Sequence, residues 1–173
     1  PLKTAAGRRQ EIRRQPQQER RLRLTFKSIK EPLLLHTSDT HNTCEYDAAL
    51  GQYVAHIRTS VLGRRTIARS TSDEFRHFKP PENVFWPGTI SRPSQTWYSN
   101  AKTVMPGAPD YHIMFPMGWD LTRDRFSFDL AASPDNCIWN FVPGEAVCEP
   151  GAPGSWNDGS VAPGHGMVEL PGN

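Results

Sequence analysis

The feature of this sequence that most restricts its fold is an internal repeat. Asn42 is followed by Asn100, and Asn100 by Asp158, at one constant spacing along the chain. A constant spacing is typical of proteins in which copies of one supersecondary unit stack on one another. The repeat therefore has to be explained before any local motif is interpreted.

The first two copies align without gaps over a predicted β-hairpin. Segment 53–57 aligns with 111–115, and the turn at 48–51 aligns with the turn at 106–109. A third copy opens at 155–159. Two strands joined by a tight turn therefore recur in the same register.

After the hairpin, each of the first two copies continues with an alternating third strand, a turn and a short fourth strand. These elements are 65–70, 72–78 and 83–85 in the first copy, and 126–131, 133–139 and 145–147 in the second. In each turn a serine, an aspartate and a closing aromatic residue suit a side-chain-capped turn whose ring packs between adjacent sheets.

Four strands per copy are typical of a propeller blade. A β-sandwich is the alternative, but sandwiches need no register between copies. We therefore predict an all-β fold: a partial β-propeller with two four-stranded blades and the start of a third. A propeller closes with four or more blades, so we expect the missing blades to belong to the same, longer chain.

The N-terminal residues differ from the rest in charge. Residues 1–30 contain ten of the 20 Lys and Arg residues but only two of the 18 acids, which leaves the remainder with a net charge of −6. Like charge and few apolar groups predict a disordered tail over 1–24, followed by the propeller domain over 25–173. An RNA-binding or anionic-membrane arm is the alternative for the tail, and we expect no nucleic-acid partner for the domain.

Residues suited to metal or cofactor binding are not grouped. Cys44, Cys137 and Cys148 are interpreted as free thiols, although a Cys137–Cys148 disulfide is open if the protein is exported. The six histidines lack metal-ligand spacing, and no glycine-rich phosphate loop or nucleophile elbow occurs. We therefore expect neither a cofactor nor a metal.

The sequence carries no evident targeting signal. It contains no apolar run long enough to span a membrane and no visible secretory signal. Its location is unknown; the lack of a visible signal slightly favours the cytoplasm, but the chain begins at Pro1 and an export signal outside it is an open alternative.

The copies resemble the five-bladed propeller glycosidases, the group that includes invertases, levanases and arabinanases. The likeness covers most of residues 32–173. The segments that carry it are 39–42, 46–58, 64–78, 98–117, 133–139, 143–145 and 154–159. The resemblance implies an active site at one end of the central axis, where the innermost strand of each blade begins. Hydrolysis there would need one carboxylic acid to protonate the leaving oxygen and one carboxylate to attack or activate water.

The repeat register predicts which residues line this axial site. Asp39 and Asp158 are the expected catalytic pair, and each has turn capping as its structural alternative. The predicted carbohydrate-binding residues, which head the three copies, are His41, Asn42, Trp97, Tyr98, Asn100, Trp156 and Asn157. Packing between blades is the alternative role of the tryptophans.

The sequence also departs from the sucrose-hydrolysing enzymes. Trp156-Asn157-Asp158-Gly159 only half matches their nucleophile segment, no Arg-Asp-Pro occurs, and Cys148-Glu149 reverses their Glu-Cys. The predicted function is a glycoside hydrolase-like propeller, or a related sugar phosphorylase, that acts on a carbohydrate through axial carboxylates. The alternatives are a carbohydrate-binding propeller without chemistry and a sialidase-like propeller, because 133–139 resembles the aspartate turn of sialidases.

Overall fold

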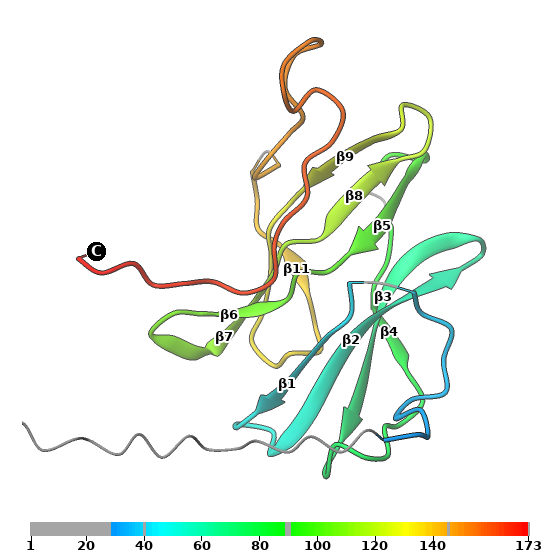
Figure 1. Cartoon of the computed structure of the whole chain (residues 1–173), viewed down its shortest axis with the longest axis vertical. Coiled ribbons are helices and arrows are strands. Elements are labelled where there is room, and N and C mark those ends of the chain that lie inside the picture. The colour runs from blue at the N-terminus through cyan, green and yellow to red at the C-terminus, as the bar shows by residue number, and fades with distance from the viewer. Residues whose placement is uncertain (1–28, 40, 89–90, 145, 173) are drawn as a thin grey trace, which may run out of the picture. The chain divides into compact units, whose positions relative to one another are not determined.

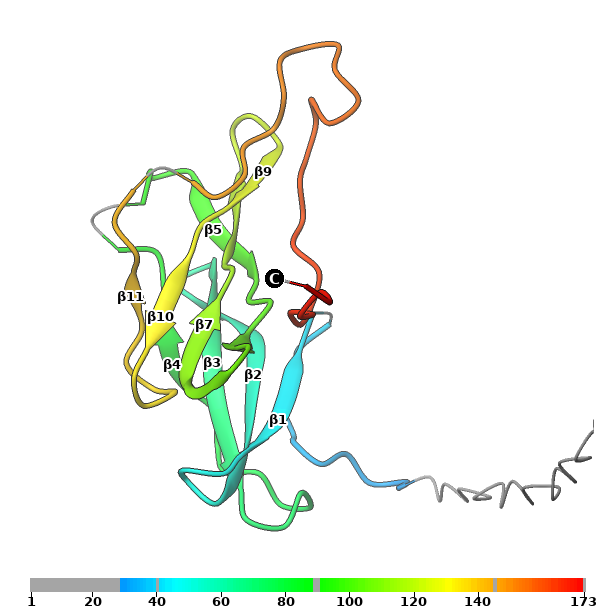
Figure 2. The same ribbon diagram turned by 90° about the vertical axis from the view of Figure 1, so that its left-hand side faces the viewer.

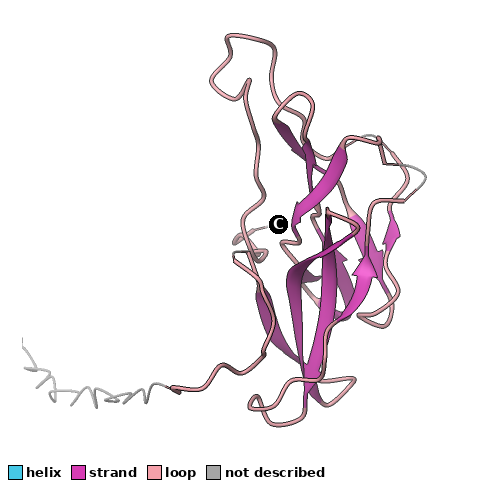
Figure 3. Cartoon of the chain, turned by 90° about the vertical axis from the view of Figure 1, so that its right-hand side faces the viewer, coloured by secondary structure: helices cyan, strands magenta, loops and turns pink. Residues whose placement is uncertain are grey.

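The computed structural model describes residues 29–39, 41–88, 91–144 and 146–172, and within them the chain is all-β, with strands and loops and no helix (Figures 1 and 3). The chain divides into two units, Pro1–Glu31 and Pro32–Asn173, and the second carries every strand. The predicted tail over 1–24 lies outside the described residues. The strands are β1 (Thr43–Asp47), β2 (Gln52–Val61), β3 (Arg64–Ser72), β4 (Glu82–Phe85), β5 (Gln95–Ser99), β6 (Thr103–Met105), β7 (Ala108–Met114), β8 (Met117–Asp120), β9 (Arg125–Phe128), β10 (Ala131–Ser133) and β11 (Asn140–Phe141).

The first copy forms one antiparallel four-stranded sheet in the order β1-β2-β3-β4. Its β2–β3 hairpin closes through Leu62 and Gly63, whose φ angles are 50° and 77°. Two successive positive φ angles define a turn whose twist matches that of the flanking strands. The predicted four-stranded unit is confirmed here, with β4 close to the expected 83–85.

The predicted hairpin recurs in the second copy. In the first copy, the carboxylate of Asp47 caps the β1–β2 turn by accepting hydrogen bonds from the backbone of Ala49 and Leu50, both at 3.1 Å. The glycine that ends this turn, Gly51, has a φ of 66°, and its counterpart between β6 and β7, Gly107, has a φ of 74°. Both hairpins therefore turn on a glycine in the left-handed conformation.

The second copy differs from the first in one respect, because its long strands are interrupted. β2 runs for ten residues, whereas its counterpart is divided at Phe115 and Pro116 into β7 and β8. Proline has no N–H to donate, and the carbonyl of Pro116 accepts from the backbone of Asp129 at 3.2 Å. The copy therefore forms two sheets, β6-β7-β10-β11 and β5-β8-β9, and the predicted strand 126–131 is divided between β9 and β10.

The core lies between the two copies. Its buried members come from both of them and are Ile67, Phe85, Trp97, Met114, Ala131 and Trp139. Phe141 packs against this cluster, with ring centroids 4.9 Å from Phe85 and 5.4 Å from Trp97. Tilted aromatic pairs at these separations pack favourably, so the two copies are held together mainly by shared apolar contacts.

The capped turn predicted at 133–139 is confirmed. The carboxylate of Asp135 accepts from the backbone of Cys137 at 2.9 Å and of Ile138 at 2.7 Å, and Trp139 closes the turn inside the core. In the first copy, Asp73 instead accepts from Gln52 at 2.6 Å, and Phe78 packs against a separate apolar cluster.

Two predictions beyond this turn were wrong. The fourth strand of the second copy is β11, directly after the capped turn, and Val147 of the expected strand 145–147 lies in a loop. The third copy opens with turns instead of a strand, and the bridge Phe126↔Ser160 ties it to β9. Figures 1 and 2 show this segment, in orange, as a loop that projects beyond β8 and β9.

Candidate functional site

The heads of the first two copies lie next to each other in the structure. The amide nitrogen of Asn100 donates to the carbonyl of His41 at 2.9 Å and to that of His56 at 3.3 Å. Its oxygen accepts from the hydroxyl of Thr43 and from the backbone of Lys102, both at 3.0 Å. With four partners and 1% exposure, Asn100 fastens one copy to the other and has no group left for a sugar.

Asn42 occupies the equivalent position in the first copy, but it is exposed. Its side-chain oxygen accepts from the hydroxyl of Ser38 at 2.7 Å and from the backbone of Arg58 at 3.3 Å. These bonds hold the segment before β1 against β2. Of the two asparagines, only Asn42 is placed where a ligand could reach it.

Arg58 is the centre of the site. Its guanidinium is buried, forms an ion pair with Asp39, and donates to the carbonyl of Tyr98 at 3.2 Å. It also lies 4.5 Å from the centroid of the Tyr98 ring. Because the side chain of Asp39 is 68% exposed, its carboxylate is held by the first copy yet open to solvent.

Further cation–aromatic contacts extend from Tyr98. Arg65 lies 5.5 Å from the Tyr98 ring and 4.8 Å from that of Trp119, and Trp119 stacks on Phe126 at 5.3 Å. Arg58, Arg65 and Trp119 were missed at the sequence level. No sequence signal set the two arginines apart, because β2 and β3 also carry other polar residues, among them Arg64 and Arg69.

A groove of about 560 Å³ opens beside Arg58, between the segment before β1 and the β2–β3 hairpin. We call it the head groove. The residues that give it its chemistry are His36, Ser38, Asp39, Arg58, Ser60 and Arg65. A carboxylate, two guanidinium groups and hydroxyls supply both acceptors and donors, which is what a polyhydroxylated ligand requires.

The predicted site residues of the third copy lie elsewhere, in the loop of Figures 1 and 2. Asp158 accepts from the backbone of Gly154 at 2.7 Å, and Asn157 accepts from the hydroxyl of Ser155 at 3.1 Å. Trp156 is 95% exposed. Both views place this loop away from the start of β1, so Asp158 caps its own turn and is not brought to Asp39.

The C-terminal segment approaches the head of the first copy through a different residue, His165. The ring of His165 lies 5.8 Å from that of His41, which in turn lies 6.0 Å from Tyr98. His41 has a φ of 57°, an uncommon backbone conformation for a residue with a side chain. His41 and Tyr98 are therefore both at the head of the copies, as expected.

Trp97 requires a correction. The resemblance implied a flat face for a sugar ring, but its side chain is 1% exposed and packs between Phe85 and Phe141. The pairing of β5 with β8 turns Trp97 toward the core, while its neighbour Tyr98 faces the arginines. The packing role is therefore the one that the structure assigns to Trp97.

A buried polar cluster stabilises the junction of the copies. Lys102 pairs with Glu45, and His112 lies 3.4 Å from Asp47, which also accepts from Asn136 at 3.0 Å. Burial lowers the pKa of Lys102 to about 8, while its contact with Glu45 favours the charged amine. Burial opposes the charge of Asp47, but hydrogen bonds from Asn136 and from the turn backbone hold its pKa below the usual value.

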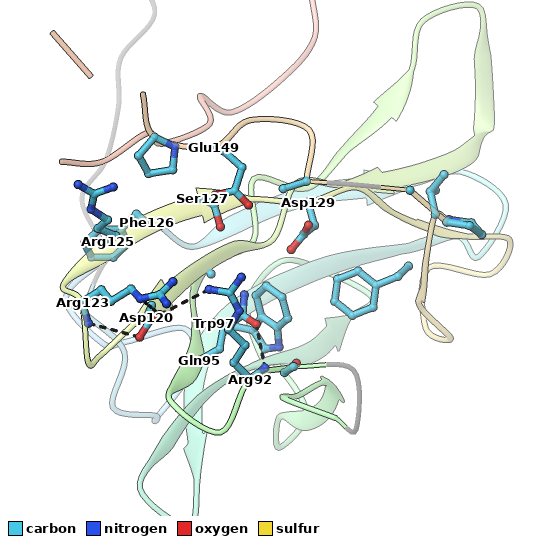
Figure 4. A pocket seen from close by; sticks show the side chains of 18 residues that line it. Arg92, Gln95, Trp97, Asp120, Arg123, Arg125, Phe126, Ser127, Asp129 and Glu149 are labelled. Atoms are coloured by element: carbon cyan, nitrogen blue, oxygen red, sulfur yellow. Dashed lines mark hydrogen bonds and ion pairs between the residues drawn. The ribbon is translucent and has the colours of Figure 1, made fainter. Parts of the chain in front are cut away.

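A second hollow, of about 840 Å³, lies on the β5-β8-β9 sheet (Figure 4). Burial, together with the charge of Glu149, raises the pKa of Asp129 in this pocket. These residues were not singled out at the sequence level, since they lie far from the copy heads. No group of three or more His, Cys, Asp or Glu side chains is arranged to hold a metal within the described ranges.

The fold is that of a partial β-propeller. It is similar to an N-acetylgalactosamine deacetylase from F. plautii, solved with blood group B trisaccharide, with a TM-score of 0.57 and 17% identity over 68% of this chain and 32% of that one. A candidate glycoside hydrolase from Parabacteroides distasonis aligns with a TM-score of 0.49 and 15% identity over 60% and 32% of the two chains. A candidate glycosidase from Bacteroides thetaiotaomicron gives 0.46 and 22% over 61% and 32%.

The chain spans about a third of the length of these structures. No family model and no curated protein matches its sequence. Among the residues described, no helix has the length and apolarity needed to cross a bilayer.

Proposed function

We propose that this chain is part of a carbohydrate-active β-propeller and that the head groove binds a saccharide. The observation that carries the proposal is the bridge through Arg58, which joins Asp39 at the head of one copy to Tyr98 at the head of the next, beside an open groove. The glycosidase-like fold supports the ligand class, and the deacetylase from F. plautii was solved with a trisaccharide.

The roles follow from the chemistry of each group. Asp39 accepts hydrogen bonds from sugar hydroxyls, Arg58 and Arg65 donate to ring and hydroxyl oxygens, and Asn42 offers an exposed amide. The ion pair with Arg58 holds the Asp39 carboxylate in place at the edge of the groove, where it can accept hydrogen bonds from a ligand.

Glycoside hydrolysis by Asp39 and Asp158 is the second candidate. Such a reaction needs two carboxyl groups within about 5–10 Å of each other, and in this structure Asp158 caps a separate loop. Hydrolysis therefore requires that loop to approach the groove, whereas saccharide binding does not. Binding is thus the better supported of the two functions. A sialidase-like function is favoured only by the capped turn at 133–139.

The test is calorimetric titration of the chain with blood group B trisaccharide, galactose, mannose and a wider panel of neutral glycans. We expect Asp39→Asn to weaken binding at least tenfold, which corresponds to about 1.4 kcal/mol, and the exposed Asp110→Asn to leave it unchanged. Equal affinity in all three proteins would contradict the proposal.

A parallel assay with aryl glycosides separates binding from hydrolysis. If Asp39→Asn and Asp158→Asn each abolish turnover and leave binding measurable, the chain is a hydrolase. If no aryl glycoside is turned over while the titrations show binding, the non-catalytic alternative holds.

A further inference from the structure

The pocket on the β5-β8-β9 sheet has a composition of its own. We call it the sheet pocket. Its volume of about 840 Å³ lies within the range typical of sites for small organic ligands. The side chains that give it its chemistry are Arg92, Asp120, Arg123, Arg125, Asp129 and Glu149. None of these belongs to the head groove, so the two hollows can be tested separately.

Two carboxyl groups in the sheet pocket differ in their burial. Figure 4 shows Asp129 and Glu149 directed into the pocket above Trp97. Asp129 is half-buried and follows β9, whereas Glu149 is exposed on the segment after β11. Burial and the negative charge of Glu149 raise the pKa of Asp129. Both carboxyl groups can therefore accept hydrogen bonds from hydroxyls that enter the pocket.

The arginines of the pocket are only loosely paired. Arg92 and Arg123 approach the same carboxylate, that of Asp120, at 3.8 Å and 3.9 Å. These distances are longer than a direct hydrogen bond, so the guanidinium N–H groups can bind another acceptor. Trp97, 1% exposed, lines the same pocket, and its indole Nε1 has no partner among the described residues.

The charge balance disfavours strongly charged ligands. Three arginines face three carboxyl groups, so a phosphate or sulfate would meet as much repulsion as attraction. A neutral ligand with many hydroxyls can use donors and acceptors together, and Phe141 supplies an apolar surface. The size of the pocket suits an oligosaccharide better than a single sugar ring.

We propose that the sheet pocket is a second saccharide site, which binds a neutral oligosaccharide through hydrogen bonds to the carboxyl groups of Asp129 and Glu149 and to the loosely paired guanidinium groups. The inference shares its ligand class with the proposed function but rests on different residues. A chain with both sites binds two ligands, one in each hollow.

The test is calorimetric titration of the full chain with a panel of neutral trisaccharides, and with tri-galacturonic acid as an anionic probe. We expect two sites for a neutral probe. Asp129→Leu and Glu149→Leu each weaken the second site at least tenfold, whereas Asp129→Asn, which keeps hydrogen-bonding groups in a side chain of the same shape, weakens it less than threefold. Asp39→Asn affects only the first site. A circular dichroism spectrum like that of the parent, and one cooperative unfolding transition, are the control for the folding of each variant.

The outcomes are distinct. Loss of one site in Asp39→Asn and of the other in Asp129→Leu supports both proposals. If the Asp129 and Glu149 variants leave every isotherm unchanged, or no neutral probe binds apart from the site removed by Asp39→Asn, the second site is overturned. Tenfold tighter binding of the anionic probe also overturns it.

Discussion

Asn42 and Asn100 hold the same position in successive copies but use their amides in opposite ways. The oxygen of Asn42 accepts two hydrogen bonds, whereas the nitrogen of Asn100 donates to two backbone carbonyls. The same residue type at equivalent positions therefore stabilises an exposed loop in the first copy and the buried junction between the copies in the second.

This difference gives a matched pair of variants. In Asn100→Asp the carboxylate cannot donate to the carbonyls of His41 and His56, and we expect a loss of about 2–3 kcal/mol in the free energy of unfolding. In Asn42→Asp the acceptor is retained, and we expect a change below about 0.5 kcal/mol. Urea denaturation of both variants measures the difference, and equal losses would contradict the assignment.

Asp129 yields a prediction on pH. Folding raises the pKa of Asp129. The free energy of unfolding therefore falls as the pH rises from the ordinary pKa to the folded pKa, because over this range the native state binds the proton more tightly than the unfolded state does. The groups that face Asp129 in the pocket are Asp120, Glu149 and the arginines Arg92, Arg123 and Arg125.

We therefore expect Asp129→Asn to unfold at a higher temperature than the parent protein at neutral pH, and the two to converge under acidic conditions where Asp129 is protonated in both the native and the unfolded state. Thermal unfolding followed by circular dichroism across this pH range is the measurement. If the variant is less stable than the parent at neutral pH, then burial and the charge of Glu149 do not raise the pKa of Asp129 in the native state.

At the scale of the element, the turns are specified by single residues. Gly63 has a φ of 77°, and a Cβ added there would meet no atom within 4 Å, so only its backbone conformation resists substitution. We expect Gly63→Ala to cost about 1 kcal/mol, and Gly164→Ala, at ordinary φ and in open space, to be neutral or slightly stabilising. Chemical denaturation of the two variants compares them directly.

The capped turn at 133–139 gives a second prediction at this scale. Asp135→Ala removes the acceptor for the backbone of Cys137 and Ile138, with an expected cost of about 1 kcal/mol. The hydrogen bond from the backbone of Ile138 contributes most to holding the pKa of Asp135 below its usual value. The stabilisation by the ionised carboxylate is therefore complete above the unfolded-state pKa and is lost as the pH falls through the folded-state pKa. The parent and the variant should therefore differ at neutral pH and converge in acid; a constant difference would contradict the cap.

At the scale of the whole molecule, the shared core predicts that the two copies unfold together. Trp139 belongs to the second copy but packs with Ile67 and Phe85 of the first. We expect Trp139→Ala to cost about 3–5 kcal/mol in one shifted transition, and Trp156→Ala, at a site 95% exposed, to change little. Calorimetry that shows two separate transitions in the parent would mean that the copies are independent.

Much of the fold could be predicted from the repeat. Register and turn chemistry are local properties, so the hairpins, the four strands of the first copy and the Asp135 turn follow from them. The division of the second copy at Pro116 and the strand at β11 depend on tertiary pairing, which periodicity does not encode. The loop of the third copy shows the same limit, because a matched motif does not ensure a strand.

The candidate site was predicted in part. Equal spacing brought Asn42, Asn100 and Tyr98 to one junction, but spacing does not tell a buried residue from an exposed one. Trp97 and Asn100 therefore face the interior. Arg58 was missed because a buried cation needs partners from two copies, and Asp129 because Glu149 reaches it from a distant segment.

The interruption at Pro116 has a consequence beyond the sheet it divides. In the first copy, β3 is unbroken and all of its residues belong to the sheet. In the second copy, the residues between β9 and β10 lie outside the sheet, and Asp129 is one of them. The backbone N–H of Asp129 donates to the carbonyl of Pro116. Because Asp129 lies outside the hydrogen-bonded ladder, its side chain can face the sheet pocket. Two copies with the same architecture can thus differ in the side chains that they present to a ligand.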